Sequence, residues 1–228
     1  MIDTLYKTVL NVSNKNQRGK ITPSEFNNLT NQSIKAIYSE LFSDFRKLNA
    51  RSNRLQDSPN YGKEAFNLKQ AIEYYVKDVV TTVSKDRLKL PADFYAVNSL
   101  FGDDAEYQKT DLVQFNRLKS SGRMKPTSSA PIYSLNGGEL KIAPAVDNKR
   151  LNLVYYRTPK APKWTYVIVG GTEMFNPDAP DYQDLDIHPM LLHRLFVEIM
   201  SLIGINLRDE YISQAVAQMK QVEVMNEQ

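Results

Sequence analysis

The residues best suited to acid–base or metal chemistry are the two histidines, His188 and His193, which are five positions apart. On a single helix they would point about 140° away from each other, so they could not hold one metal ion together. His188 immediately precedes Pro189, and proline suits the first turn of a helix. We therefore expect His188 to cap the start of a helix, and neither histidine predicts a catalytic or metal site.

Two groups of carboxylates are candidates for calcium binding. They are Asp103, Asp104, Glu106 and Asp111, and Asp178, Asp181, Asp184 and Asp186. The first group lacks the glycine at the sixth position and the glutamate at the twelfth that an EF-hand loop has. The second group precedes the helix expected at Pro189, whose positive N-terminal end favours nearby carboxylates. Both groups therefore indicate solvated loops.

Two glycine pairs, Gly137-Gly138 and Gly170-Gly171, are candidates for phosphate-binding loops. A phosphate loop must lead directly into a helix N-terminus, and neither pair does, so we expect both to be turns. The absence of cysteine excludes disulfides, thiol nucleophiles and thiolate metal sites. No set of nucleophile, base and orienting residue can be named. The sequence therefore predicts a protein that is not an enzyme and has no cofactor or metal.

Nucleic-acid binding without catalysis is the alternative function that the composition leaves open. It is supported by a pI near 8.8 and by aromatic residues that could stack on bases. These residues are Tyr74, Tyr75, Tyr155, Tyr156, Trp164 and Tyr166. However, the 29 basic and 26 acidic residues are spread along the chain and form no basic arm or stripe. Aromatic residues are also common on sheets and at protein interfaces, which favours a role in protein contacts.

The length and hydrophobicity of the chain predict an ordinary globular protein. Its 228 residues, 42% of them hydrophobic, suffice for one large domain or for a domain with an inserted lobe. No apolar run approaches the roughly 20 residues that a membrane span needs, and the N-terminus lacks the features of a signal peptide. We expect a protein made in the cytoplasm that does not bind membranes.

The stretch from residue 131 to 164 predicts a compact β structure. Alternating apolar residues flank Asn136, Gly137 and Gly138, which accept the positive φ angles of a hairpin turn. Pro144 ends the second strand because proline cannot donate to the ladder. A third strand, with Leu151, Leu153 and Tyr155 on one face, is expected to share one hydrophobic face with the hairpin.

A long helix is predicted over residues 22–50. Thr22 suits the N-cap, Pro23 the first helical position, and Glu25 the return contact of a capping box. An apolar stripe follows at Phe26, Leu29, Ile34, Ile37, Leu41, Phe45 and Leu48. At 1.5 Å per residue this helix is about 40 Å long, so we expect it to contact neighbouring subunits.

Shorter elements complete the prediction. A helix carries Ile2, Leu5, Val9 and Val12 on one face, and another starts at Lys63 with Phe66, Ile72, Tyr75 and Val76 pointing inward. Strands are expected at residues 79–83, 87–97 and 164–169, with a short helix at about 112–118. The segment 170–186 is expected to be an acidic connection. The chain then closes with a helix that starts at Pro189 and ends at Gly204, and with a last helix over residues 209–225.

This order of elements predicts an α+β fold. The helices of residues 1–78 and 187–228 are expected to pack as a bundle, and residues 79–186 to form an inserted, antiparallel β-rich lobe.

The chain also resembles a known family. The features that carry the resemblance are the Ile132-Tyr133 strand, the Gly137-Gly138 turn, the Leu140-x-Ile142-x-Pro144 strand and a strand ending Tyr155-Tyr156-Arg157-x-Pro159-Lys160. In this order, between a long helix opened by residues 21–26 and two closing helices, they resemble the head-to-tail adaptor proteins of short-tailed phages. The likeness is greatest to the ring and connector proteins of crAss-like phages.

The resemblance implies a structural virion protein. Such a protein is one protomer of a connector ring between portal and tail, with about twelve copies around the DNA channel. The implied partners are further copies of the chain, the portal protein, other tail proteins, and genomic DNA that passes without sequence specificity during ejection. The implied location is the tail of the virion, after synthesis in the host cytoplasm.

Contacts between subunits are expected to involve apolar residues of the long helix and of the last helix. The candidates are Phe26, Ile34, Ile37, Tyr38, Leu41, Phe45, Tyr211 and Met219. The segment beyond Val222 is expected to reach into the portal.

Overall fold

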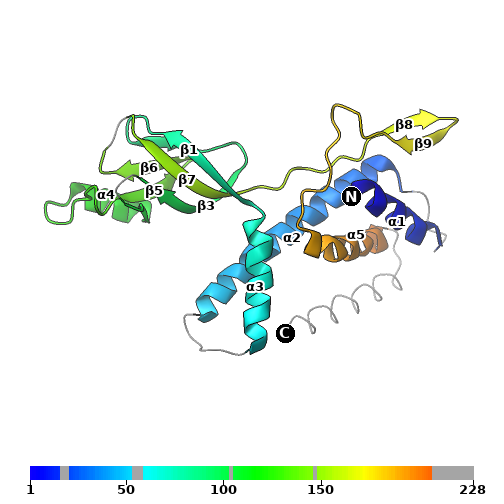
Figure 1. Ribbon diagram of the computed structural model, residues 1–228, viewed down its shortest axis with the longest axis horizontal. Coiled ribbons are helices and arrows are strands. Elements are labelled where there is room, and N and C mark those ends of the chain that lie inside the picture. Colours follow the sequence, from blue (N-terminus) through cyan, green and yellow to red (C-terminus); the bar gives the residue numbers. More distant parts are fainter. Residues whose placement is uncertain (16–20, 53–58, 103–104, 146–147, 207–228) are drawn as a thin grey trace. The chain divides into compact units, whose positions relative to one another are not determined.

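The computed structural model describes residues 1–15, 21–52, 59–102, 105–145 and 148–206 (Figure 1). The chain forms two compact units, one made of Met1–Tyr74 with Pro159–Gln228 and one made of Tyr75–Thr158. We call them the helical unit and the β unit. The prediction places the boundaries after residues 78 and 186, whereas these units divide the chain after Tyr74 and Thr158, so that residues 159–186 group with the helices. The α+β class is as predicted.

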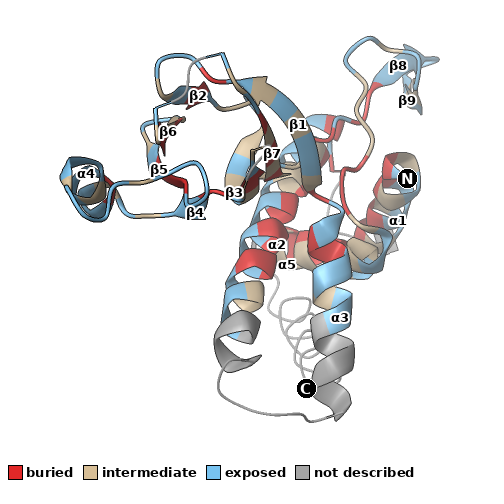
Figure 2. Cartoon of the chain, turned by 60° about the vertical axis from the view of Figure 1, so that its left-hand side comes forward, coloured by how far each residue is buried: buried red, intermediate tan, exposed pale blue. Residues whose placement is uncertain are grey.

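The helical unit contains helices from both ends of the chain. They are α1 (Ile2–Lys15), α2 (Pro23–Ser52), α3 (Pro59–Glu73), the short 3-10 helix η1 (Pro189–Leu191) and α5 (Leu192–Asn206). Helix α2 packs against α3 and α5, and α1 also contacts α5. Apolar residues of these helices, among them Ile2, Phe26, Ile37 and Ile199, are at most 1% exposed. Figure 2 shows buried stretches in red on α2 and α5. Phe26, Ile34, Ile37 and Leu41 of the apolar stripe of α2 are therefore part of the core of their own unit.

Local signals placed two helix starts correctly. At α2, the amide of Thr22 donates to Glu25 Oε2 at 2.9 Å, and the amide of Glu25 donates to Thr22 Oγ1 at 3.3 Å. This is the predicted capping box. The hydrogen bonds from the Thr22 amide and hydroxyl lower the pKa of the Glu25 carboxyl. At η1, the amide of Met190 donates to Nδ1 of His188, which confirms that His188 is a cap.

Other helix predictions were wrong in detail. Helix α3 begins at Pro59, before Lys63, and Val76 belongs to a strand. Phe66 is 64% exposed, whereas Ile72 is buried. The reason is that residues six apart on a helix lie about 120° from each other, so these two do not share a face. Gly204 lies inside α5, which continues to Asn206. The predicted helix over residues 209–225 lies outside the described residues.

The β unit consists of two sheets. One has the order β1-β7-β3, with β1 Val76–Thr82, β7 Arg150–Arg157 and β3 Phe94–Phe101, and is antiparallel. The other has the order β2-β6-β5-β4, with β2 Arg87–Lys89, β6 Glu139–Ala143, β5 Ile132–Asn136 and β4 Gln108–Lys109. In this second sheet β2, β6 and β5 pair antiparallel, and the two-residue strand β4 runs parallel to β5. The short helix α4 (Leu112–Ser120) packs against β5.

The predicted hairpin is present, but its relation to the third strand was wrong. Strands β5 and β6 pair antiparallel around Gly137 and Gly138, whose φ angles are 57° and 87°. Strand β7, however, pairs with β1 and β3 in the other sheet. Its residues Leu151, Leu153 and Tyr155 join Leu140 and Ile142 in one buried cluster. The hydrophobic face of β7 thus belongs to the same core as the hairpin but to a different sheet.

Candidate assembly surface

A second hairpin, which we call the apolar hairpin, carries the most exposed run of hydrophobic residues described in the helical unit. It pairs β8 (Tyr166–Val169) with β9 (Thr172–Phe175) around Gly170 and Gly171, both at positive φ. Every residue of β8 is exposed, and Ile168 and Val169 have 70% and 56% of their surface in solvent. The strand at residues 164–169 and the glycine turn were predicted, but β9 was missed. The sequence signal that could have predicted β9 is the pair of apolar runs on either side of Gly170-Gly171.

The apolar hairpin forms a sheet of its own, because β8 and β9 pair only with each other among the described strands. Its two faces are both partly apolar, since Val167 pairs with Met174 on one face and Tyr166 with Phe175 on the other. A two-stranded hairpin is marginally stable in water unless something packs against it. The hairpin therefore needs support at its base, and it offers an apolar surface beyond that base.

Trp164 supplies the support at the base. Its indole is 3% exposed and lies 4.2 Å from the ring of Tyr6 in α1, measured between centroids. It also stacks on Tyr166 and Phe175, the first and last residues of the hairpin, at 5.8 and 5.9 Å. Burial, the first cause, and the nearby Glu173 and Tyr166 raise the pKa of Tyr6 to about 12, so its hydroxyl stays neutral. Aromatic contacts thus join the hairpin to helix α1.

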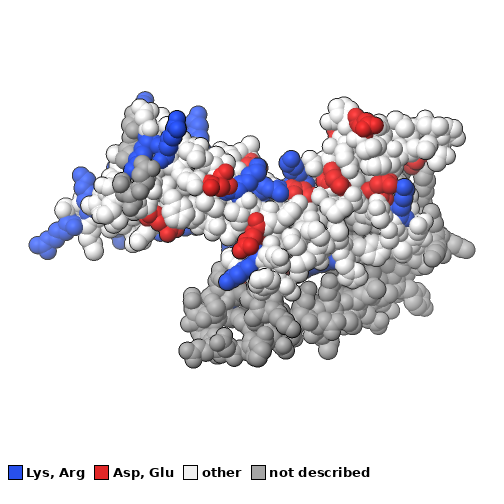
Figure 3. All heavy atoms as spheres, in the orientation of Figure 1, with Lys and Arg blue, Asp and Glu red and all other residues white. Residues whose placement is uncertain are grey.

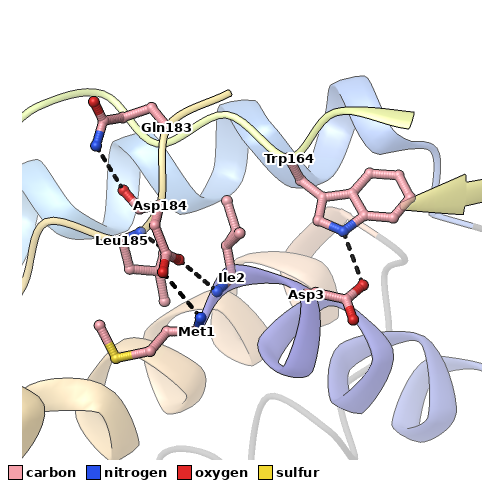
Figure 4. A network of polar contacts seen from close by, with 7 residues as sticks. All are labelled: Met1, Ile2, Asp3, Trp164, Gln183, Asp184 and Leu185. Atoms are coloured by element: carbon pink, nitrogen blue, oxygen red, sulfur yellow. Dashed lines mark hydrogen bonds and ion pairs between the residues drawn. The ribbon is translucent and has the colours of Figure 1, made fainter. Parts of the chain in front are cut away.

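Hydrogen bonds fix the position of Trp164. The side-chain amide of Asn27 in α2 donates to the carbonyl oxygen of Trp164 at 3.0 Å and accepts from its amide at 2.7 Å. The indole N–H donates to Asp3 Oδ1 at 3.1 Å (Figure 4). These contacts tie residue 164 to both N-terminal helices, so the chain enters the hairpin at a fixed point.

Asp184 holds the chain after the hairpin against the start of α1 (Figure 4). Its Oδ1 accepts from the amide of Ile2 at 2.7 Å and from the amide of Leu185 at 2.8 Å, and its Oδ2 lies 3.0 Å from the N-terminal ammonium of Met1. Partial burial raises the pKa of the Asp184 carboxyl, but the hydrogen bonds and the ammonium outweigh burial and lower it overall. A carboxylate at this place also suits the positive end of α1.

The predicted interface residues of α2 are not on this surface. Phe26, Ile34, Ile37, Tyr38 and Leu41 are at most 4% exposed. Phe45 is half-buried. Tyr211 and Met219 lie outside the described residues. The buried side chains are occupied by contacts within the helical unit, so their apolar character gives no argument for a contact between subunits.

The candidate polar sites form no chemical centre in the described part of the chain. No group of three or more His, Cys, Asp or Glu residues lies close enough there to hold a metal ion. A groove of about 530 Å³ runs beside the hairpin base, lined by Asn27, Asn28, Asn31 and Trp164 among others. Its carboxylate Asp181 pairs with Lys163. No described helix has the length and apolarity that crossing a membrane requires.

These features describe a helical unit that supports an exposed apolar hairpin. The class of protein comes from the comparison with known families. The family model described as "SU10 adaptor protein" matches residues 31–226. The chain belongs to the SU10 adaptor protein family and is therefore a structural adaptor protein of a bacteriophage. No curated protein matches the chain.

Proposed function

We propose that this protein is one protomer of an adaptor ring that joins the portal of a short-tailed phage to its tail and surrounds the passing DNA. The family supports the adaptor role. The observation that carries the proposal further is the apolar hairpin, whose four β8 residues are all exposed. A single protomer in water would leave this surface uncovered, whereas an assembly can bury it.

The neighbouring copy is the partner that we propose for the hairpin. A ring forms when two different patches of each protomer meet and the rotation closes. Permanent contacts of this kind bury roughly 2,000 Å² or more and are more hydrophobic than transient ones. The hairpin suits one of the two patches because it is apolar and held rigidly at its base by Trp164. Contacts of α2 with a neighbour, and of the segment beyond Val222 with the portal, stay predictions.

The test replaces an exposed apolar residue of the hairpin with a charged one. Ile168→Asp should leave the subunit folded, because Ile168 is 70% exposed. It should prevent ring closure, because the new carboxylate would be buried without a partner in the contact. Native mass spectrometry of the protein alone and with portal gives the oligomer mass.

The matched control is Val80→Asp, at an exposed apolar strand residue of the β unit, 65% in solvent. We expect Val80→Asp to assemble as the unmodified protein does. Rings of unchanged mass from Ile168→Asp would refute the role of the hairpin.

A further inference from the structure

Four cations from three segments of the β unit surround a pocket of about 260 Å³. Lys85 and Arg87 come from the turn before β2 and its first residue, Lys119 from α4, and Lys141 from β6. Asp86 is the only carboxylate among the described residues that line it. We call this the cationic pocket. The sequence shows no basic stripe because these residues are spread over positions 85–141 and only the fold brings them together.

The turn that forms one wall of the cationic pocket is locally unfavourable. Ser84 and Arg87 exchange two backbone hydrogen bonds, at 2.9 and 3.0 Å, which makes a two-residue turn of Lys85 and Asp86. Their φ angles are 49° and 64°. Such a turn favours Asn-Gly, and a non-glycine residue in this region costs about 1–3 kcal/mol. Lysine at position 85 is therefore not explained by the stability of the turn.

A second local cost lies beside the first. Arg87 stands directly opposite Lys141 in the antiparallel pair of β2 and β6. Like charges directly opposite each other destabilise a sheet. Two destabilising features at one pocket, the positive φ of Lys85 and the Arg87–Lys141 pair, are typical of a functional site, because both lower the stability of the fold.

Two of the four cations at the cationic pocket form ion pairs with carboxylates. Arg87 Nη1 lies 3.1 Å from Glu139 Oε2, and Lys119 Nζ lies 3.4 Å from Asp86 Oδ2. Both pairs are partly exposed, and such pairs contribute only about 0–1 kcal/mol. Lys141 has no ion-pair partner in the described part of the chain. An anion with more charge than a single carboxylate can therefore replace these ion pairs at little cost in free energy.

The β unit as a whole is also basic. The β unit contains 13 Lys and Arg against 9 Asp and Glu, so it carries a net charge of +4, more than the +3 of the whole chain. Residues 112–138 contain no acidic residue, and Arg117, Arg123 and Lys125 are exposed there. Figure 3 shows Lys and Arg side chains on the surface of this unit. Cations on several segments can contact successive phosphates of one backbone.

We propose that the cationic pocket binds a phosphate group of the DNA backbone, without regard to sequence. The choice of DNA as the source of the phosphate rests on the proposed place of the protein around the DNA path. Lysine and arginine supply the positive charge and the N–H donors that a phosphate needs. The pocket carries Lys85 and the Arg87–Lys141 pair because phosphate binding requires them.

The experiment measures the affinity of the full chain for a labelled duplex of about 20 base pairs by fluorescence anisotropy at several salt concentrations. Lys85→Asn and Lys141→Gln should each weaken binding equally for unrelated sequences and reduce the slope of log K against log salt by about 1. Lys85→Asn should also keep or raise the melting temperature, because asparagine accepts positive φ better than lysine. Weaker binding by a more stable variant is not expected from a merely structural role.

Lys109→Gln, an exposed cation of β4 outside the pocket, is the matched control and should bind DNA as the unmodified protein does. Unchanged binding in both pocket variants, or an equal loss in the control, would overturn the proposal. Polyglutamate that competes as well as DNA would also overturn it, because the ligand would then be a carboxylate. Oligomer mass is measured in parallel. If the protein forms rings but does not bind DNA, this inference is rejected and the proposed role in an adaptor ring is not affected.

Discussion

Single residues connect the separate chain segments of the helical unit. Trp164 contacts α1 through Tyr6 and Asp3 and contacts α2 through Asn27. Asp184 ties the segment after the hairpin to the first turn of α1. Both residues lie in the part of the chain that the sequence assigned to the β-rich lobe. Their side chains explain why this part packs with the helices.

Asp184 makes stability depend on pH. Because its pKa is lowered in the folded protein, its contribution is present above the unfolded value near 3.8 and is lost as the pH falls through the folded pKa. Asp184→Asn should therefore lower the melting temperature at pH 7, and the difference from the unmodified protein should shrink below about pH 4. Thermal unfolding followed by circular dichroism between pH 7 and pH 3 measures this.

The control for Asp184 is Asp178→Asn, which removes an exposed carboxylate from the same connection. We expect little change in its melting temperature at pH 7. A difference between Asp184→Asn and the unmodified protein that is constant from pH 7 to pH 3 would show that the charge of Asp184 has no role.

At the scale of elements, the capping box sets the start of α2. Thr22→Ala removes the hydroxyl that accepts from the Glu25 amide, and it should lower the free energy of unfolding by about 1 kcal/mol. Ser24→Ala, at a neighbouring exposed position, should change it by less than about 0.5 kcal/mol. Urea denaturation compares the two variants. Equal effects would mean that the cap does not stabilise the helix.

The two hairpins show how similar turn sequences lead to different surroundings. Asn136-Gly137-Gly138 joins strands of a four-stranded sheet, and Leu140 and Ile142 are fully buried there. Gly170-Gly171 joins strands that have no further neighbour among the described strands, and β8 stays exposed. The turn chemistry is local, whereas the burial of a strand depends on which distant segment pairs or packs with it.

At the scale of the whole molecule, each of the two compact units has a hydrophobic core of its own. Leu153 is fully buried in the β unit, and Ile37 is 1% exposed in the helical unit. We expect calorimetry to show two transitions. Leu153→Ala should lower the free energy of unfolding of the β unit, and Ile37→Ala that of the helical unit. Each loss should be about 2–5 kcal/mol, because the substitution creates a cavity. A single transition that both variants lower would contradict independent units.

Local sequence signals determined the elements whose formation depends on neighbouring residues. Thr22, Pro23 and Glu25 predicted the start of α2, Asn136 to Gly138 the turn of the first hairpin, and His188 the cap of η1. For Thr22 and His188 the hydrogen-bonding partner lies within three residues. For the first hairpin the turn glycines themselves permit the positive φ angles. The alternation of Leu151, Leu153 and Tyr155 also predicted the buried face of β7 correctly.

Only the tertiary structure decided which surfaces those elements bury and which they expose. An apolar stripe such as that of α2 is the same pattern whether α5 or a neighbouring subunit covers it. Here contacts inside the chain bury Phe26, Ile34, Ile37 and Leu41. The partner sheet of β7, the exposure of β8 and the gathering of Lys85, Arg87, Lys119 and Lys141 likewise depend on segments far apart in sequence. Hydrophobic burial and charge clustering are non-local, so sequence patterns specify the faces of the elements but not their partners.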